Sequence, residues 1–66
     1  MQILVNEQPC ETADSCTVAM LLEQLGLTAK PVAVEVNLQL VPRQRHSEHG
    51  LASGDRVEIV TLVGGG

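Results

Sequence analysis

The sequence of 66 residues contains no phenylalanine, tyrosine or tryptophan. Its core must therefore be built from aliphatic side chains, and stacking of aromatic rings on nucleic-acid bases is excluded. Basic residues are also few: four lysines and arginines stand against eight acidic residues, and the net charge is -4. A surface that binds phosphate backbones has the opposite sign. We therefore expect no nucleic-acid partner, whereas an acidic chain is suited to approach a basic protein surface.

Long hydrophobic runs are lacking as well. No apolar stretch approaches the ~20 residues of a membrane span, and the first residues carry no basic region or secretory pattern. Cysteines are limited to Cys10 and Cys16, while small secreted scaffolds usually hold more. We expect two reduced thiols that serve as small side chains, with a persulfide or mixed disulfide as the alternative. The expected location is the cytoplasm, without a membrane partner.

The short length favours a carrier or a binding module over an enzyme. A domain of this size buries only about 60% of the surface of its unfolded chain, and enzyme pockets need roughly 300 Å³ or more. No catalytic residue is predicted. His46 and His49 lie three positions apart in a polar segment, but no further ligands complete a metal site, so we expect none. A Gly-rich phosphate-binding loop with lysine is also missing, so no bound cofactor is expected.

Hydrophobic periodicity predicts one helix after two short strands. Residues 2–6 are rich in strand formers, residues 7–9 suggest a turn, and residues 10–12 suggest a returning strand. Thr17 then precedes an apolar set at helical spacing and is a candidate N-cap. That set is Val18, Leu21, Leu22 and Leu25. Gly26 is placed to end the helix.

The second half of the chain predicts further strands. Residues 32–36 form a β-branched run, residues 38–41 suggest a short strand that Pro42 stops, and residues 57–63 form the last strand. The polar stretch 43–50 between them is expected to be irregular and solvated, with a turn of tight helix as an option. The order is β-β-α-β-β-β in a single domain over residues 1–66. It predicts an α+β fold with a mixed sheet of four to five strands packed on one helix.

Alternation along the strands predicts which side chains face that helix. If Ile3, Val5, Val57 and Ile59 face the helix, their neighbours lie on the opposite side of the sheet. These neighbours form a candidate surface for a partner protein, beside the end of the chain. Its predicted members are Leu4, Val60, Leu62 and Val63.

The whole chain resembles the ThiS family, the sulfur carrier proteins of thiamine biosynthesis, which have the ubiquitin-like β-grasp fold. Four segments underlie the resemblance: the opening residues 1–6, the helix pattern from Thr17 to Leu25, the middle segment from Val34 to Arg43, and residues 54–66. The middle segment contains the Val-Pro-Arg element at residues 41–43. One departure is the lack of a tryptophan shortly after that element, where this chain has Gln44, Arg45 and His46.

The three terminal glycines are the candidate functional residues. Glycine has no side chain, so Gly64 and Gly65 could thread a slot in which any Cβ would clash. We expect residues 62–66 to form a flexible tail, which could reach roughly 13 Å beyond the fold from Val63 onwards. The carboxyl group of Gly66 is ionised at neutral pH and can attack the α-phosphate of ATP.

The resemblance implies what happens at this carboxylate. An E1-like adenylyltransferase uses ATP to adenylate Gly66, a cysteine persulfide supplies sulfur, and the resulting thiocarboxylate donates sulfur to thiazole synthase. On this interpretation the chain is not an enzyme, because its partners supply the catalytic groups. Three alternatives remain: a carrier for molybdopterin synthesis or tRNA thiolation, a ubiquitin-like protein modifier joined to a target lysine, and a plain interaction domain.

Overall fold

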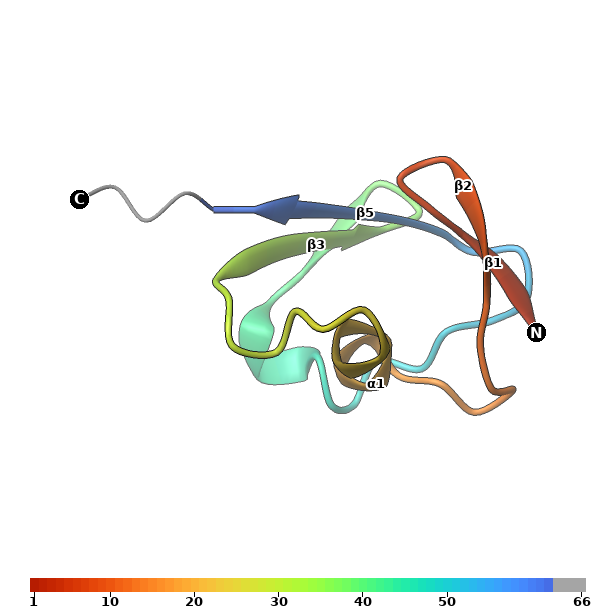
Figure 1. Ribbon diagram of the computed structural model, residues 1–66, viewed down its shortest axis with the longest axis horizontal. Helices are drawn as coiled ribbons and strands as arrows, with labels where there is room; N and C mark the ends of the chain where they lie inside the picture. The colour runs from red at the N-terminus through yellow and green to blue at the C-terminus, as the bar shows by residue number, and fades with distance from the viewer. Residues whose placement is uncertain (63–66) are drawn as a thin grey trace.

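The structure is a computed structural model that describes residues 1–62. Within these residues, one α-helix lies against one face of a five-stranded sheet with the strand order β2-β1-β5-β3-β4 (Figure 1). The elements in chain order are β1 (Gln2–Val5), β2 (Gln8–Glu11), α1 (Val18–Gln24), β3 (Val32–Val36), β4 (Gln39–Val41), the 3₁₀ helix η1 (Arg43–Arg45) and β5 (Arg56–Thr61). Strand β5 is parallel to β1 and antiparallel to β3. The predicted element order and mixed sheet are confirmed.

The hydrophobic core lies between α1 and the side of the sheet that faces it. Its buried apolar side chains are Ile3, Cys16, Val18, Leu21, Leu22, Val34, Val36, Val41, Leu51, Val57 and Ile59. The predicted inward positions Ile3, Val57 and Ile59 are confirmed, and Val5 is half-buried against the core. Leu25 is 38% exposed, so its expected burial is wrong. The helix ends at Gln24, and Leu25 is the C-cap rather than part of the buried helix face.

The ends of α1 follow the predicted local signals. The hydroxyl group of Thr17 accepts a hydrogen bond from the Met20 N–H at 3.2 Å, as expected for an N-cap. At the other end, Gly26 has a φ of +73°, a left-handed conformation that residues with a Cβ rarely adopt. The Leu27 N–H donates to the Leu22 carbonyl at 2.8 Å, which satisfies one of the last acceptors of the helix.

The segment 43–50 contains the turn of tight helix that was allowed for it and differs from its prediction at the buried His46. It contains η1, and it also supplies acceptors for the first turn of α1: the Val18 N–H donates to the His49 carbonyl at 3.0 Å, and the Ala19 N–H donates to the His46 carbonyl at 2.9 Å. His46 is buried, with 8% of its surface exposed, and its Nε2 lies 3.0 Å from the Val41 carbonyl oxygen. A helix start buried in the fold needs partners for its free N–H groups, so the loop contacts α1 through its backbone and buries His46, while most of its other side chains stay exposed.

Both hairpins of the sheet have the same two-residue turn. The segments Val5-Asn6-Glu7-Gln8 and Val36-Asn37-Leu38-Gln39 each place their two central residues at positive φ, between 49° and 70°. This geometry suits the right-handed twist of the flanking strands, and asparagine tolerates it better than most residues. The predicted turn over residues 7–9 is therefore wrong by one to two positions.

Strand β2 consequently includes Pro9, which was expected to lie in the turn. Pro9 lies opposite Leu4 on the edge strand of the sheet. In an antiparallel hairpin the pair next to a two-residue turn is hydrogen-bonded, so the pair formed by Leu4 and Pro9 is the non-bonded kind. The nitrogen of Pro9 therefore points away from β1, and its missing N–H removes no bond from the sheet.

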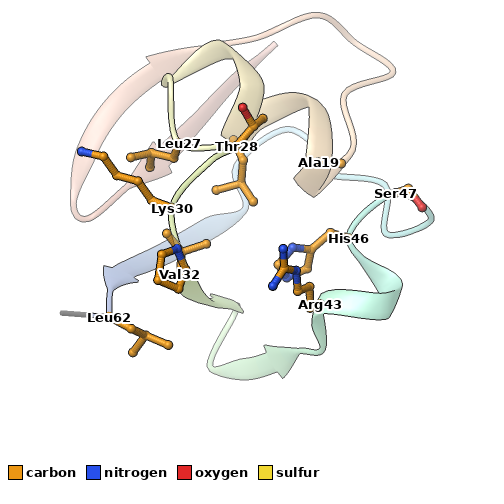
Figure 2. A pocket seen from close by; sticks show the side chains of 11 residues that line it. Ala19, Leu27, Thr28, Lys30, Val32, Arg43, His46, Ser47 and Leu62 are labelled. Atoms are coloured by element: carbon orange, nitrogen blue, oxygen red, sulfur yellow. The ribbon is translucent and has the colours of Figure 1, made fainter. Parts of the chain in front are cut away.

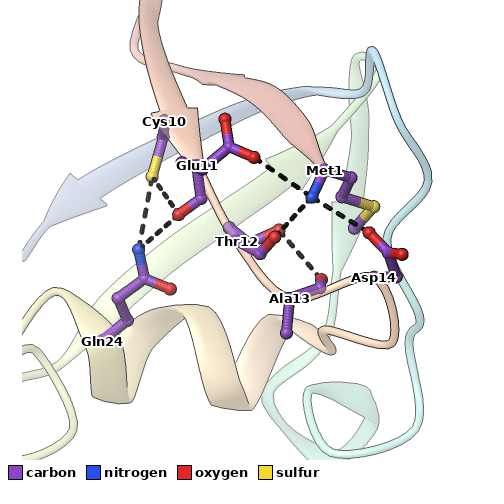
Figure 3. Close-up of polar contacts among 7 residues, drawn as sticks. All are labelled: Met1, Cys10, Glu11, Thr12, Ala13, Asp14 and Gln24. Carbon is purple, nitrogen blue, oxygen red and sulfur yellow. Dashed lines mark hydrogen bonds and ion pairs between the residues drawn. The ribbon is translucent and has the colours of Figure 1, made fainter.

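The start of the chain is held beside β2 by its amino group. Met1 N donates to the Thr12 carbonyl and lies 3.1 Å from Asp14 Oδ1 and 3.4 Å from Glu11 Oε2 (Figure 3). The hydrogen bond to Asp14, more than the one to Glu11, raises the pKa of the Met1 amino group above its ordinary value of 8.0. Gln24 joins the helix to the same strand by donating to the Glu11 carbonyl at 2.9 Å.

Candidate functional site

The candidate site is the end of β5, where the predicted tail begins. Strand β5 lies between β1 and β3, and the Leu62 N–H after it donates to the Pro31 carbonyl at 2.9 Å. Val63, Gly64, Gly65 and Gly66 lie outside the described residues, so their roles stay predictions. The structure does show that the chain is held in the sheet up to Leu62.

Strand register separates two of the predicted partner-surface residues. Val60 is 59% exposed on the outer face, the side of the sheet away from α1, and lies opposite Ala33. Leu4 is half-buried and lies opposite Arg56, four residues before Val60 along β5. Four residues of a strand span about 13 Å. The structure therefore does not bring Leu4 and Val60 together.

Leu40 is an exposed apolar residue of the outer face that the sequence interpretation missed. It is 66% exposed on the edge strand β4 and lies opposite Glu35, which in turn lies opposite Glu58. Alternation along the strand could have identified Leu40. Val41 is apolar and belongs to the core, and strand neighbours point to opposite faces, so Leu40 must lie on the outer face. The outer face thus combines apolar side chains with two carboxylates placed side by side.

A groove of about 410 Å³ opens next to Leu62 on the helix side of the sheet. One wall comes from the segment that joins α1 to β3, with Leu27 and Lys30, and continues into Val32. The facing wall comes from η1 and the residue after it, with Arg43 and His46 (Figure 2). Leu62 is 52% exposed and lines the groove at the point where the chain leaves the sheet.

Residues 1–62 meet the requirements neither of a metal site nor of a membrane-spanning helix. This part of the chain holds no group of three or more histidine, cysteine or acidic side chains that could hold a metal ion. No helix in it is long and apolar enough to cross a membrane. Cys10 is half-buried and Cys16 is buried, and both are free thiols.

The match with known sequences covers nearly the whole chain, since residues 3–66 match the model of the ThiS family. This chain belongs to the ThiS family. It is 38% identical over 66 residues to the sulfur carrier protein ThiS of Escherichia coli (strain K12), with full coverage of both chains. It is also 40% identical over 53 residues to the sulfur carrier protein ThiS of Bacillus subtilis (strain 168), with 80% of each chain covered.

The fold of this ThiS-family chain is also that of a solved relative. The crystal structure of the thiamine biosynthesis protein (ThiS) from Geobacter metallireducens superposes with a TM-score of 0.85 at 33% identity, with full coverage of both chains. The likeness confirms the predicted β-grasp fold.

A larger protein contains a similar segment. The thiazole synthase of Paramagnetospirillum magneticum is 38% identical over 66 residues, and this ThiS-family chain spans 20% of its length. A segment like this chain therefore occurs within a protein named for thiazole synthesis.

Proposed function

We propose that this chain is a sulfur carrier for the synthesis of the thiazole moiety of thiamine. The observation that carries the proposal is the match to the ThiS family from residue 3 to residue 66, which includes the three terminal glycines. The whole-chain similarity to the sulfur carrier of Escherichia coli supports the same activity. The thiazole synthase with a similar segment supports thiazole synthase as the acceptor of the sulfur.

The chemistry proceeds at Gly66, with catalytic groups from the partners. In the active site of an E1-like adenylyltransferase, a terminal carboxylate oxygen attacks the α-phosphorus of ATP and pyrophosphate leaves. The terminal sulfur of a cysteine persulfide then attacks the carbonyl carbon, and AMP leaves with the electron pair of the broken C–O bond. A thiol reduces the acyl disulfide that has formed and releases the thiocarboxylate. The chain itself supplies only the reacting group and binds no cofactor.

The fold supports this role by presenting the tail from a firm base. Strand β5 pairs with β1 at Arg56 and Val57 and with β3 as far as Thr61, and Leu62 is still bonded to Pro31. A partner that binds the body of the domain therefore finds Gly64 and Gly65 within a few residues of a fixed point. Gly66 can then reach a narrow slot, because the last three residues carry no side chains. The free thiols of Cys10 and Cys16 fit a reducing compartment, and we place the carrier in the cytoplasm.

Intact mass spectrometry tests the function directly. The chain is incubated with an E1-like adenylyltransferase, ATP, a persulfide donor and a thiol, and fragments are mapped. We expect one oxygen to be replaced by one sulfur at Gly66. A variant that ends at Gly65 is the control and should stay unchanged.

Two other outcomes would contradict the carrier. An adenylated mass that never gains sulfur, together with conjugates to lysine, would favour the protein modifier. A chain left unchanged by every such mixture would favour an interaction domain.

A further inference from the structure

The Val41-Pro42-Arg43 element contains one residue that the fold does not explain. Val41 is 4% exposed and belongs to the core, and Pro42 ends β4 and precedes η1. Arg43 is exposed at the start of η1 and lines the groove beside Leu62. Within residues 1–62 the ion pairs involve only the amino group of Met1, so no carboxylate of the described chain neutralises Arg43.

Lys30 adds a second positive charge to the same groove. It comes from the segment between α1 and β3, and the described chain gives it no ion-pair partner either. The chain has only four lysines and arginines and a net charge of -4, and two of these four cations line this groove. The two cations make the groove a favourable place for a carboxylate on a chain whose net charge is negative.

The remaining lining of the groove is suited to an apolar side chain. Leu27 and Val32 are half-buried and pack against the core, and Leu62 is partly exposed at the opening. His46 lies beside Arg43 on the facing wall (Figure 2), and the hydrogen bond between its Nε2 and the Val41 carbonyl holds its ring in place. An apolar pocket with a small number of placed polar groups is the usual form of a specific binding site.

We propose that this groove binds an acidic segment of the adenylyltransferase that receives the tail. A carboxylate of that segment lies between Lys30 and Arg43, and a neighbouring aliphatic or aromatic side chain packs on Leu27, Val32 and Leu62. The position of Leu62 supports this occupant, because Leu62 lines the groove and directly precedes the residues that the adenylyltransferase is proposed to bind. The proposal rests on the proposed function and adds to it the surface that orients the domain before the tail reacts.

Charge reversal tests the proposal with a closely matched control. Arg45 is exposed, belongs to η1 like Arg43 and does not line the groove. The dissociation constant is measured for the adenylyltransferase that converts the wild-type chain, using Lys30→Glu, Arg43→Glu and Arg45→Glu. We expect each groove variant to bind roughly tenfold more weakly or worse, and Arg45→Glu to change binding about twofold or less. All three side chains are exposed, so thermal unfolding should show intact domains.

Each result decides the matter. If Arg43→Glu and Arg45→Glu weakened binding to the adenylyltransferase equally, the effect would come from the overall charge, and the groove would be overturned as a docking site. If the wild-type chain is converted to the thiocarboxylate and the groove variants bind the adenylyltransferase as tightly as it does, the groove is overturned as a docking site and the carrier function stands. A wild-type chain that no adenylyltransferase converts would overturn the function and this partner with it. The free chain is also tested for saturable binding of inorganic phosphate or AMP. If Arg43→Glu abolishes that binding but still binds the enzyme, the groove is assigned to a small anion instead.

Discussion

The side chain of Asn6 hydrogen-bonds the backbone of Ile59 in both directions. Its Nδ2 donates to the Ile59 carbonyl at 3.1 Å, and its Oδ1 accepts from the Ile59 N–H at 2.8 Å. The backbone N–H of Asn6 also donates to the Val57 carbonyl at 2.8 Å. The parallel pairing of β1 with β5 thus continues into the hairpin turn, where the side-chain amide of Asn6 makes the hydrogen bonds that a strand backbone would make. The strand that leads to the tail is held at this point by a residue from the other end of the sequence.

Removal of the Asn6 amide should destabilise the domain. We expect Asn6→Gly to lower the free energy of unfolding by about 1–3 kcal/mol, because the partly buried N–H and C=O of Ile59 lose their partners. Asn6→Ala should cost about 1 kcal/mol more, since φ at this position is 49° and alanine is strained there while glycine is not. Urea denaturation measures both. If Asn6→Gly were as stable as the wild-type chain, water would be shown to satisfy the N–H and C=O of Ile59 as well as the Asn6 side chain does.

Gly26 and Gly50 form a natural pair for measuring backbone strain. A Cβ added at either position meets nothing within 4 Å, but only Gly26, of the two, has a positive φ, +73°. Gly26→Ala should therefore lower the free energy of unfolding by about 1 kcal/mol. Gly50→Ala should be neutral or raise it slightly by restricting the unfolded chain. Thermal and urea unfolding of the two variants compare the effects, and an equal response at both sites would contradict the role of Gly26 as the left-handed residue that follows the C-cap Leu25.

The Met1 amino group should give the stability a pH dependence above neutrality. Its pKa is raised in the folded chain, first by the hydrogen bond to Asp14, so folding favours the charged form. The contribution is complete below the unfolded pKa of 8.0 and is lost as the pH rises through the higher folded pKa. We expect Asp14→Asn to lower the stability slightly at pH 7 and hardly at pH 10, and so to reduce the drop between these two values. The partner carboxylates of Glu11 and Asp14 are exposed, so the effect is small, and an identical drop in both proteins would refute it.

The proposed tail chemistry requires an unobstructed carboxyl group at Gly66. Replacing Gly66 with leucine, or adding one residue after it, should abolish ATP–pyrophosphate exchange by the adenylyltransferase. The physical reason is that a side chain or an extra residue cannot fit where the glycine tail ends in the proposed slot. Melting temperatures should not change, because the altered positions follow the last strand. Normal exchange with either variant would be incompatible with a narrow slot.

Local signals in the sequence predicted those parts of the fold that short-range physics decides. The N-cap at Thr17, the helix end at Gly26 and the strand Val32–Val36 all follow from the residues at those places. The first hairpin turn was predicted one to two positions too late, because Pro9 suggested a turn and the asparagine at residue 6 was a weaker signal. Asparagine tolerates the left-handed conformation, and the same Val-Asn-x-Gln turn recurs at residue 37.

The sequence by itself determined the alternation along each strand, the apolar face of the helix and the segments that place the chain in its family. Strand period and helix period require only neighbouring residues. Tertiary structure alone decided that His46 is buried, that Asn6 bonds to Ile59 and that Lys30, Arg43 and Leu62 line one groove. These relationships join residues far apart in sequence. They arise because β5 inserts between β1 and β3, and because the loop after β4 must supply partners for the first turn of α1.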